Sequence, residues 1–266
     1  MPLQLRFCSL FSGSSGNASF VSFGETALLI DAGLPAKTLT AALDAIGVSP
    51  SDLSGILITH EHSDHVRGLE TLAKRYRLDV FASEGTWDAM GPRFPGLLPR
   101  QRREFRPEED FYIGQVNVLP FEIPHDAAQP VGFCLEAGGK KVSFATDLGH
   151  TSREVIDRAA NSDVLLLEAN HDVEMLKAGP YPAMLKRRIL GNRGHLSNEA
   201  CALALQKLLP GLKYVFLGHL SRENNAPELA YAAAEGAALR LGARIGSDIF
   251  LSVAYPNRTA EPVVLA

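Results

Sequence analysis

The sequence predicts an α/β protein in which helices are laid against sheets. Two observations predict this class. Apolar runs of strand length alternate with amphipathic helical segments in the first third of the chain, and several strands then follow one another from residue 111 onward. A third observation is that residues able to bind metal stand directly after several of these strands. The 266 residues contain no linker and no marked shift in composition, so we expect one domain over residues 1–266.

The first third of the chain alternates strands and helices. Strands are predicted over residues 5–10, 18–23, 26–30, 55–59 and 79–82, where apolar side chains dominate. A helix is predicted over residues 35–46, because Pro35 fits the first helical position and Gly47 a helix end. A second helix is predicted over residues 66–76, with Leu69 and Leu72 turned inward.

Two loops in this part could bind phosphate. Residues 12–17 are glycine, serine and asparagine, whose free N–H groups can form an anion site, although a plain turn has the same composition. Residues 91–107 hold four prolines and five arginines (Arg93, Arg100, Arg102, Arg103 and Arg106). We expect an irregular segment there, which is either a solvated surface loop or a positive patch for phosphate.

The remaining two thirds begin with a run of strands. Strands are predicted over residues 111–113, 116–122, 131–137 and 141–146, with Gly138-Gly139 as a hairpin turn. Further strands are predicted over residues 163–168, 214–217 and 248–254. The helices predicted between and around them cover residues 152–159, 181–190, 198–209 and 227–241.

The densest chemical signal is the segment His60-Glu61-His62-Ser63-Asp64-His65. Three of the eight histidines of the chain fall within these six residues, directly after the strand predicted over residues 55–59. Open α/β sheets place their sites on the loops that leave the carboxyl ends of strands. Imidazole and carboxylate ligands suit zinc, manganese or iron better than calcium or magnesium. We therefore interpret the segment as a metal site.

Other candidate ligands also follow predicted strands, which suggests that several strands pool their ligands at one edge. We assign His60, His62 and His125 to one ion, in the three-histidine pattern of catalytic zinc. Asp64, His65 and His219 would hold a second ion, and Asp147 would bridge the two. Asp31 would lie behind the ligands and orient a histidine through its free ring nitrogen.

A pair of divalent ions, Zn²⁺ or Mn²⁺, about 3.5–4 Å apart would hold a hydroxide between them and stabilise the entering and leaving oxygens of a displacement. Such a site needs no serine or cysteine nucleophile. The three cysteines, Cys8, Cys134 and Cys201, stand far apart in apolar surroundings and form no CxxC pair. We expect them to be reduced core residues, which fits a cytoplasmic protein.

Composition limits the remaining possibilities. The chain has 46% hydrophobic and 21% charged residues and a net charge of −4, as in an ordinary globular protein. No apolar run approaches the roughly 20 residues of a membrane span, and we expect no secretory signal and no membrane partner. The negative charge argues against a generic nucleic-acid coat, but a local basic groove is compatible with it. The composition leaves the oligomeric state open.

The pattern resembles the metallo-β-lactamase superfamily. The HxHxDH motif at residues 60–65 comes with Asp31 before it and His125, Asp147 and His219 after it, in the order found in that family. The resemblance covers essentially the whole chain and implies a four-layer αββα sandwich. Redox members that bind iron carry an acid at the position of His62, so the resemblance favours a hydrolase.

Within the superfamily the chain is similar to the YycJ family, also called WalJ or VicX. The similarity lies in Ser12-Gly13-Ser14-Ser15-Gly16-Asn17, in the segment at 167–172 and in the Gly-His-Leu-Ser of 194–197 and 218–221. The resemblance implies a nuclease that degrades double-stranded DNA from 5′ to 3′, with a possible role in DNA repair. DNA is thus a more natural substrate than RNA.

The last part of the chain is also similar to tRNase Z. That resemblance implies that His195 donates a proton to the leaving oxygen and that Glu168 holds His195, so Asp64, Glu168 and His195 are the expected catalytic residues. The chain shows neither an inserted β-CASP domain nor a long tRNA-binding arm. Expected substrate contacts are Ser14, Ser15, Asn17, Asn170, Arg222 and Asn224.

Other basic and imidazole side chains have two interpretations each. Lys186-Arg187-Arg188 and Arg193 either contact phosphate or form the polar face of a helix. His150 and His171 are interpreted as polar neighbours of the site rather than ligands.

Three functions compete for this site. The first is a phosphodiesterase acting on nucleic acid, and the second is a hydrolase of a small ester, thioester or lactam on the same scaffold. The third is a regulatory protein that keeps the fold without turnover. The full ligand set argues against the third, and His195 with Glu168 favours the first.

Overall fold

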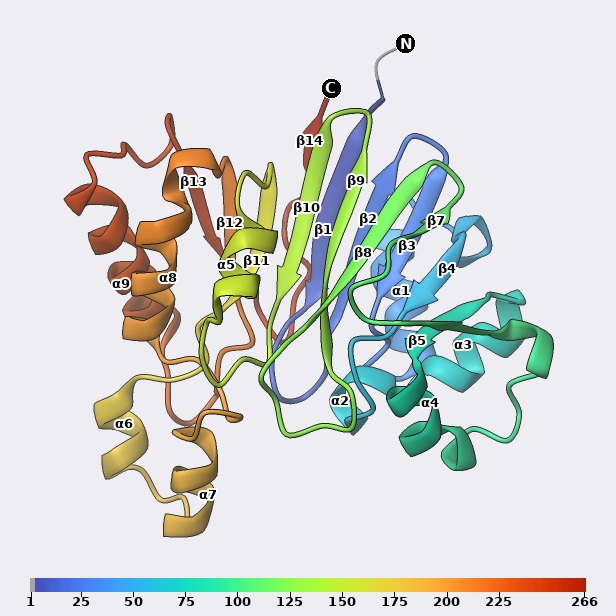
Figure 1. Cartoon of the computed structure of the whole chain (residues 1–266), viewed down its shortest axis with the longest axis horizontal. Helices are drawn as coiled ribbons and strands as arrows, with labels where there is room; N and C mark the ends of the chain where they lie inside the picture. Colours follow the sequence, from blue (N-terminus) through green and yellow to red (C-terminus); the bar gives the residue numbers. More distant parts are fainter. Residues whose placement is uncertain (1–2) are drawn as a thin grey trace.

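Two seven-stranded sheets form the frame of the molecule in a computed structural model that describes residues 3–266 (Figure 1). The first sheet has the order β14-β1-β2-β3-β4-β5-β6. Its strands are β1 (Leu5–Phe11), β2 (Ala18–Phe23), β3 (Thr26–Ile30), β4 (Gly55–Leu57), β5 (Val80–Ser83), β6 (Arg102–Phe105) and β14 (Val263–Leu265). The second sheet has the order β13-β12-β11-β10-β9-β8-β7. Its strands are β7 (Phe111–Ile113), β8 (Val116–Glu122), β9 (Val131–Ala137), β10 (Lys140–Ala145), β11 (Val164–Glu168), β12 (Tyr214–Gly218) and β13 (Phe250–Val253).

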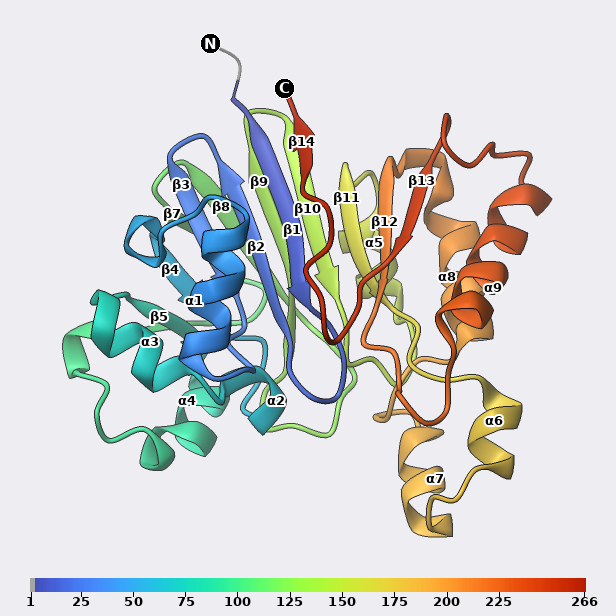
Figure 2. The same cartoon turned by 180° about the vertical axis from the view of Figure 1, so that it is seen from behind.

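Helices cover the outer face of each sheet (Figures 1 and 2). The first sheet carries α1 (Ala36–Ala45), α2 (Ser63–Val66), α3 (Leu69–Tyr76) and α4 (Glu84–Met90). The second carries α5 (Arg153–Ala159), α8 (Asn198–Leu208) and α9 (Pro227–Arg240). Helices α6 (Val173–Ala178) and α7 (Ala183–Ile189) project beyond the sheets, at the end opposite the two chain termini (Figure 1). Short 3₁₀ turns lie at Pro50–Asp52, Gly91–Arg93, Pro99–Gln101 and Leu209–Gly211.

Three separate apolar layers explain why the sandwich has four layers. One lies between the two sheets and includes Phe7, Val21 and Phe133. The other two lie between each sheet and its helices. Residues of β1 alternate between layers, because successive side chains of a strand point to opposite faces: Phe7 joins the layer between the sheets and Cys8 the layer under the helices. The predicted α/β class and αββα sandwich are confirmed.

Several element predictions were incomplete. The helix predicted over residues 66–76 begins at Leu69, and Val66 is the last residue of the separate helix α2. The break lies at Gly68, which donates its N–H to Ala32 and has no room for a Cβ, since that atom would lie 2.1 Å from the Leu34 carbonyl oxygen. The segment 91–107 predicted as irregular contains strand β6, which pairs in parallel with β5. Helices α4 and α6 and strand β14 were not predicted. The strand predicted over 55–59 ends at Leu57.

Strand direction brings the predicted site residues to one edge. Strands β3, β4 and β5 are parallel in the first sheet. In the second sheet β10, β11 and β12 are parallel to one another, and β8 runs the same way because both β8 and β10 are antiparallel to β9. The carboxyl ends of all these strands therefore point to the end of the sandwich that carries α2, α6 and α7 (Figure 1).

Candidate metal centre

The backbone turns sharply where three strands deliver their polar residues. Asp31, Asp147 and His219 follow β3, β10 and β12 and adopt left-handed backbone angles, with φ of 61°, 62° and 56°. Such a conformation costs a non-glycine residue about 1–3 kcal/mol. Only six non-glycine residues in the described part of the chain have positive φ, and these are three of them. Strain is thus concentrated at the edge where the predicted ligands lie.

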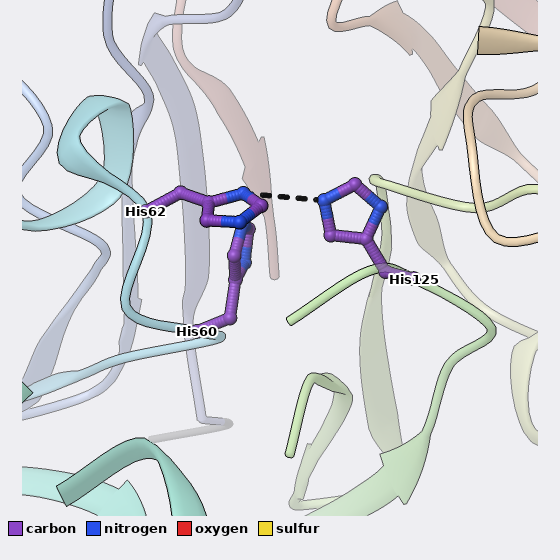
Figure 3. Close-up of side chains that lie close together, drawn as sticks. All are labelled: His60, His62 and His125. Atoms are coloured by element: carbon purple, nitrogen blue, oxygen red, sulfur yellow. Dashed lines mark hydrogen bonds between the residues drawn. The ribbon is translucent and has the colours of Figure 1, made fainter. Parts of the chain in front are cut away.

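His60, His62 and His125 form the first group of ligand atoms (Figure 3). His62 Nδ1 lies 3.3 Å from His125 Nε2, and His60 packs against both rings with centroid distances of 4.5 and 5.0 Å. His125 Nδ1 lies 3.2 Å from the Gly194 carbonyl oxygen, which can only accept, so the lone pair of His125 is on Nε2. Three imidazole nitrogens thus point to a common centre.

Burial favours the neutral form of His60 and His125. The His60 side chain is fully buried, and burial together with the neighbouring histidines holds its pKa well below the usual value. Burial also lowers the pKa of His125. Neutral imidazole is the form that binds a metal ion.

Asp64, His65 and His219 form the second group. Asp64 Oδ2 lies 3.6 Å from His65 Nε2 and 3.7 Å from His219 Nε2. Burial would raise the pKa of Asp64, but His65 and His219 hold it well below its usual range. The group therefore offers one carboxylate oxygen and two ring nitrogens.

Asp147 lies between the two groups and is 2% exposed. Its Oδ1 is 3.8 Å from His125 Nε2, and its Oδ2 is 3.5 Å from His65 Nε2. Oδ1 thus faces a histidine of the first group and Oδ2 a histidine of the second. A carboxylate that bridges two ions needs this arrangement.

Unsatisfied atoms test whether these residues fit metal ions. Among the described residues, His60 Nε2, His219 Nε2 and Asp147 Oδ2 are buried without any hydrogen-bond partner. Leaving a buried polar atom unpaired costs about 1–3 kcal/mol, so such atoms are rare in native proteins. All three belong to predicted ligands and aim into the two groups. The donor set of imidazole and carboxylate fits Zn²⁺ or Mn²⁺.

Asp31 and Thr59 hold His65 from behind. His65 Nδ1 lies 2.8 Å from Asp31 Oδ2, so Nδ1 carries the proton and the lone pair is on Nε2, which lies 3.0 Å from Asn17 Nδ2. Burial lowers the pKa of His65, but Asp31 and the other nearby carboxylates outweigh burial and raise it to about 9. Asp31 Oδ1 accepts from the N–H of Thr59 at 2.9 Å, and the Thr59 hydroxyl donates to Asp31 at the same distance. Asp31 thus contacts the ring nitrogen of His65 that faces away from the predicted centre, and its role in orienting a metal ligand stays a prediction.

Glu168 holds two histidines at once. Its Oε1 accepts from Nδ1 of His195 and from Nδ1 of His219, both at 2.8 Å. Its Oε2 accepts from the backbone N–H groups of Leu148 at 2.6 Å and Leu196 at 3.1 Å. Burial would raise the pKa of Glu168, but His195 and His219 hold it well below its usual range. The buried carboxylate is therefore ionised and fixes Nε2 of each ring as the outward atom.

A cavity of about 230 Å³ opens over these ligands. His195 is 19% exposed and forms part of its wall. Three residues of the segment around α7 also line the cavity, and these were not singled out from the sequence: Tyr181, Leu185 and Ile189. No local motif marks them, because only the path of the chain after α6 brings them there.

The predicted substrate contacts divide into two sets. Ser14 and Asn170 line the cavity, and Arg222 lies at the molecular surface with its Nη2 3.1 Å from Ser15 Oγ. Asn17 and Asn224 do not line it. Asn17 is buried, with Nδ2 3.0 Å from His65 Nε2, and Asn224 is fully buried beside Ser221. Asn17 therefore contacts a predicted ligand directly, and Asn224 supports the loop that follows His219.

The loop at residues 12–17 does reach the site. Ser12 Oγ accepts from the N–H of His219 at 2.8 Å, and Asn17 contacts the second group. The loop is thus part of the ligand scaffold rather than an isolated turn. Ser12 was missed as a site residue, although it opens the segment that the sequence singled out.

The basic residues do not form one phosphate patch. Arg93 Nη1 donates to the Glu61 carbonyl oxygen at 2.8 Å, close to the histidine loop. Arg103 pairs with Asp79 and Arg106 with Glu109, beside a different cavity next to β6. In the second basic group only Arg188 lines the metal-side cavity, where it also pairs with Asp126 at 3.1 Å.

Arg193 and His150 bind backbone carbonyl groups, whereas both ring nitrogens of His171 are buried without a hydrogen-bond partner. Arg193 Nε donates to the His125 carbonyl oxygen at 2.9 Å, which supports a ligand rather than a phosphate. His150 is exposed, with Nδ1 3.0 Å from the Asn192 carbonyl oxygen. His171 is 1% exposed and does not line the cavity.

No helix in the described part of the chain is both long and apolar enough to span a membrane.

Comparison with known proteins agrees with this geometry. Residues 26–217 match the sequence model of the family described as "Beta-lactamase superfamily domain". The chain is 40% identical over 229 residues to "Exodeoxyribonuclease YycJ" of Bacillus anthracis, covering 86% of this chain and 87% of the relative. It is 38% identical over 264 residues to "Exodeoxyribonuclease WalJ" of Streptococcus pneumoniae, covering 98% of both.

Solved structures show the same fold at low sequence identity. The metallo-β-lactamase fold protein YhfI of Bacillus subtilis has a TM-score of 0.71 and 16% identity, covering 96% of this chain and 99% of that one. Zn²⁺-bound PqqB of Methylobacterium extorquens has a TM-score of 0.67 and 18% identity, with the same two coverages. The chain therefore belongs to the metallo-β-lactamase superfamily and, within it, to the family of YycJ and WalJ.

Proposed function

We propose that this protein is a metal-dependent exodeoxyribonuclease that hydrolyses phosphodiester bonds in DNA. The observation that carries the phosphodiester part is His195, which lines the cavity over both ligand groups with its Nδ1 held by Glu168 at 2.8 Å. The DNA part is supported by the exodeoxyribonucleases that are 38–40% identical over most of the chain. The 5′-to-3′ direction and a role in DNA repair belong to the same proposal and are taken from the family.

The residues that would hold the ions follow from the two groups. His60, His62 and His125 would bind one ion, Asp64, His65 and His219 the other, and Asp147 both. Two divalent ions, when bound, would lower the pKa of water and neutralise charge on the scissile phosphate.

The chain itself would supply the proton for the leaving group. Because Glu168 holds the Nδ1 proton of His195, the doubly protonated ring would donate its second proton, on Nε2, to an oxygen in the cavity. Departure of an alkoxide from a phosphodiester needs that proton near neutral pH. Glu168 holds both His195 and the proposed metal ligand His219. An ester or lactam hydrolase with the same metal ligands has less need of a proton donor such as His195.

The cavity suits one end of a polymer. Its volume of about 230 Å³ is below the roughly 300–1,000 Å³ of pockets that enclose whole small ligands. The Tyr181 ring and the apolar side chains of Leu185 and Ile189 form one wall, which suits stacking of a terminal base. Arg188 stands on the same wall and can contact phosphate.

In the test, purified protein is mixed with Mn²⁺ or Zn²⁺ and is then given end-labelled single- and double-stranded DNA and RNA as substrates. We expect DNA cleavage from the ends, and we expect His195→Ala to reduce the rate by ~10²-fold while the metal content stays the same. His150→Ala, at an exposed histidine outside the cavity, is the matched control. A His195→Ala variant as fast as the parent removes the proton donor. Cleavage of a p-nitrophenyl ester by loaded protein that cuts none of the polymers refutes the nuclease.

A further inference from the structure

Helix α9 presents an exposed face that nothing else in the described chain covers. The buried side of the helix, which includes Ala230, Ala234 and Ala237, packs into the layer over the second sheet. The opposite side carries two large apolar residues, Leu229 at 42% and Leu239 at 60% exposure. We call the following set the α9 face: Glu228, Leu229, Ala232, Gly236, Leu239 and Arg240.

The α9 face is symmetric about its middle. Its members stand in pairs at equal distances before and after Ala234: Glu228 with Arg240, Leu229 with Leu239, and Ala232 with Gly236. At about 100° per residue, all six lie roughly 120–160° around the helix from Ala234, which is 2% exposed. The centre of symmetry is therefore buried, and the paired residues share the solvent side.

We propose that the α9 face is the contact of a two-fold symmetric homodimer in which two α9 helices pack antiparallel. A two-fold axis brings residue i of one chain against residue j of the other and j against i. With the axis opposite Ala234, each leucine meets a leucine and each small residue meets a small residue. Glu228 of each chain then meets Arg240 of the other.

Charge complementarity selects a second copy as the partner. Neither Glu228 nor Arg240 has an ion-pair partner within residues 3–266. Gln206 of α8 can present its amide oxygen to Arg240 at 3.1 Å, but a neutral amide leaves the charge uncompensated. The two residues are 12 positions apart, about 18 Å along the helix, so they cannot pair within one helix. In the antiparallel dimer two Glu228–Arg240 pairs form between the chains, one at each end of the contact.

Gly236 supports a close approach of another helix. Glycine inside a helix lowers its stability relative to alanine, so its presence there needs a reason. The chain's own packing gives none, because a Cβ at Gly236 would meet only Arg240 Nη1 at 3.5 Å. A second helix crossing at Ala232 and Gly236 would use the space that the missing side chain leaves.

The test is the mass of the full chain in solution by light scattering or sedimentation, from about 1 to 100 μM. We expect a species of twice the 28.7 kDa chain mass at the upper concentrations. Ala232→Arg should weaken the dimer by about tenfold or more, because it places two charges at the apolar centre. Leu98→Arg, at a residue 44% exposed outside the α9 face, is the control and should leave the dimer intact.

A charge exchange tests the antiparallel arrangement itself. Glu228→Arg and Arg240→Glu should each weaken the dimer by about tenfold, because each sets like charges opposite each other at both ends. The double variant should restore the parent affinity to within about threefold. Thermal unfolding of every variant shows whether the chain is still folded. A chain that is monomeric at 100 μM overturns the proposal, as does a dimer that Ala232→Arg leaves unchanged or a double variant no better than the singles.

Discussion

Glu168→Gln is the most informative substitution, because glutamate and glutamine have the same shape but differ in how many hydrogen bonds they can accept. Glu168 receives four hydrogen bonds: two from imidazole nitrogens at 2.8 Å and two from backbone N–H groups at 2.6 and 3.1 Å. A glutamine has one carbonyl oxygen and one NH₂ group, which only donates. In either orientation the NH₂ group faces two donors.

The cost follows from this count. If the NH₂ group faces the backbone, two hydrogen bonds to a charged group are lost, each worth about 1.5–3 kcal/mol. If it faces the histidines, their Nδ1 atoms must accept, and the proton moves to Nε2, the atom through which we propose that His219 binds metal. We therefore expect a loss of at least about 3 kcal/mol of stability, which lowers Tm by roughly 6–12 °C in a chain of this size. We also expect metal affinity or activity to fall by about 10–100-fold.

The assay combines calorimetry, elemental analysis and end-labelled DNA cleavage. Glu199→Gln makes the same change at an exposed position of α8 and should alter none of the three readings. Glu168→Gln protein with the parent Tm, metal content and rate would show that the carboxylate does not hold the two histidines.

Three further substitutions and one chemical test follow from the site. Asp147→Ala should lose at least one ion per chain by elemental analysis, since one oxygen faces each ligand group, and unchanged stoichiometry would refute the bridging role. Tyr181→Ala should raise KM for DNA by roughly tenfold, with Tyr181→Phe close to the parent, because stacking of a base is worth about 1–3 kcal/mol; equal KM values for all three proteins would contradict the base-stacking wall. Gly33→Ala should displace Asp64 and deplete bound metal, because a Cβ there would lie 1.6 Å from the Asp64 carbonyl oxygen, and a fully metallated variant would count against this contact. Burial raises the pKa of Cys8 to about 12 and that of Cys134 and Cys201 above the ordinary value, so thiolate is scarce at pH 8 and a thiol reagent should react with none of them in folded protein and with three after denaturation; rapid labelling of the folded chain would contradict this burial.

Residues that follow apolar strands could be placed from the sequence. Strand direction alone brings Asp31, Asp147 and His219 to one edge, because parallel strands end together. Helix α4 was missed although a cap signal was present: Ser83 accepts from the N–H of Thr86. A serine at a helix N-cap can be recognised in the sequence even when the helix that follows it is short.

Other features depend on contacts between distant segments and carry no local signal. Strand β14 pairs with β1, with Leu265 opposite Leu5. No sequence pattern in either strand indicates which other strand it pairs with. Tyr181 reaches the cavity only because α6 and α7 project from the end of the sandwich. Asn17 was expected at the substrate, but its side chain is fixed by His65 and by the Gly13 N–H, which folding alone could reveal.

The placement of the ligand groups between the two sheets has a mechanical consequence. His60 and His62 come from the first sheet and His125 from the second, while Asp64 and His65 come from the first and His219 from the second. Each bound ion would therefore act as a cross-link between the halves of the sandwich. At a free metal concentration 1,000 times Kd, one such ion stabilises the folded chain by about 4.1 kcal/mol. The metals would thus fasten the inter-sheet core as well as serve the reaction, and chelation should loosen the molecule along the seam between its sheets.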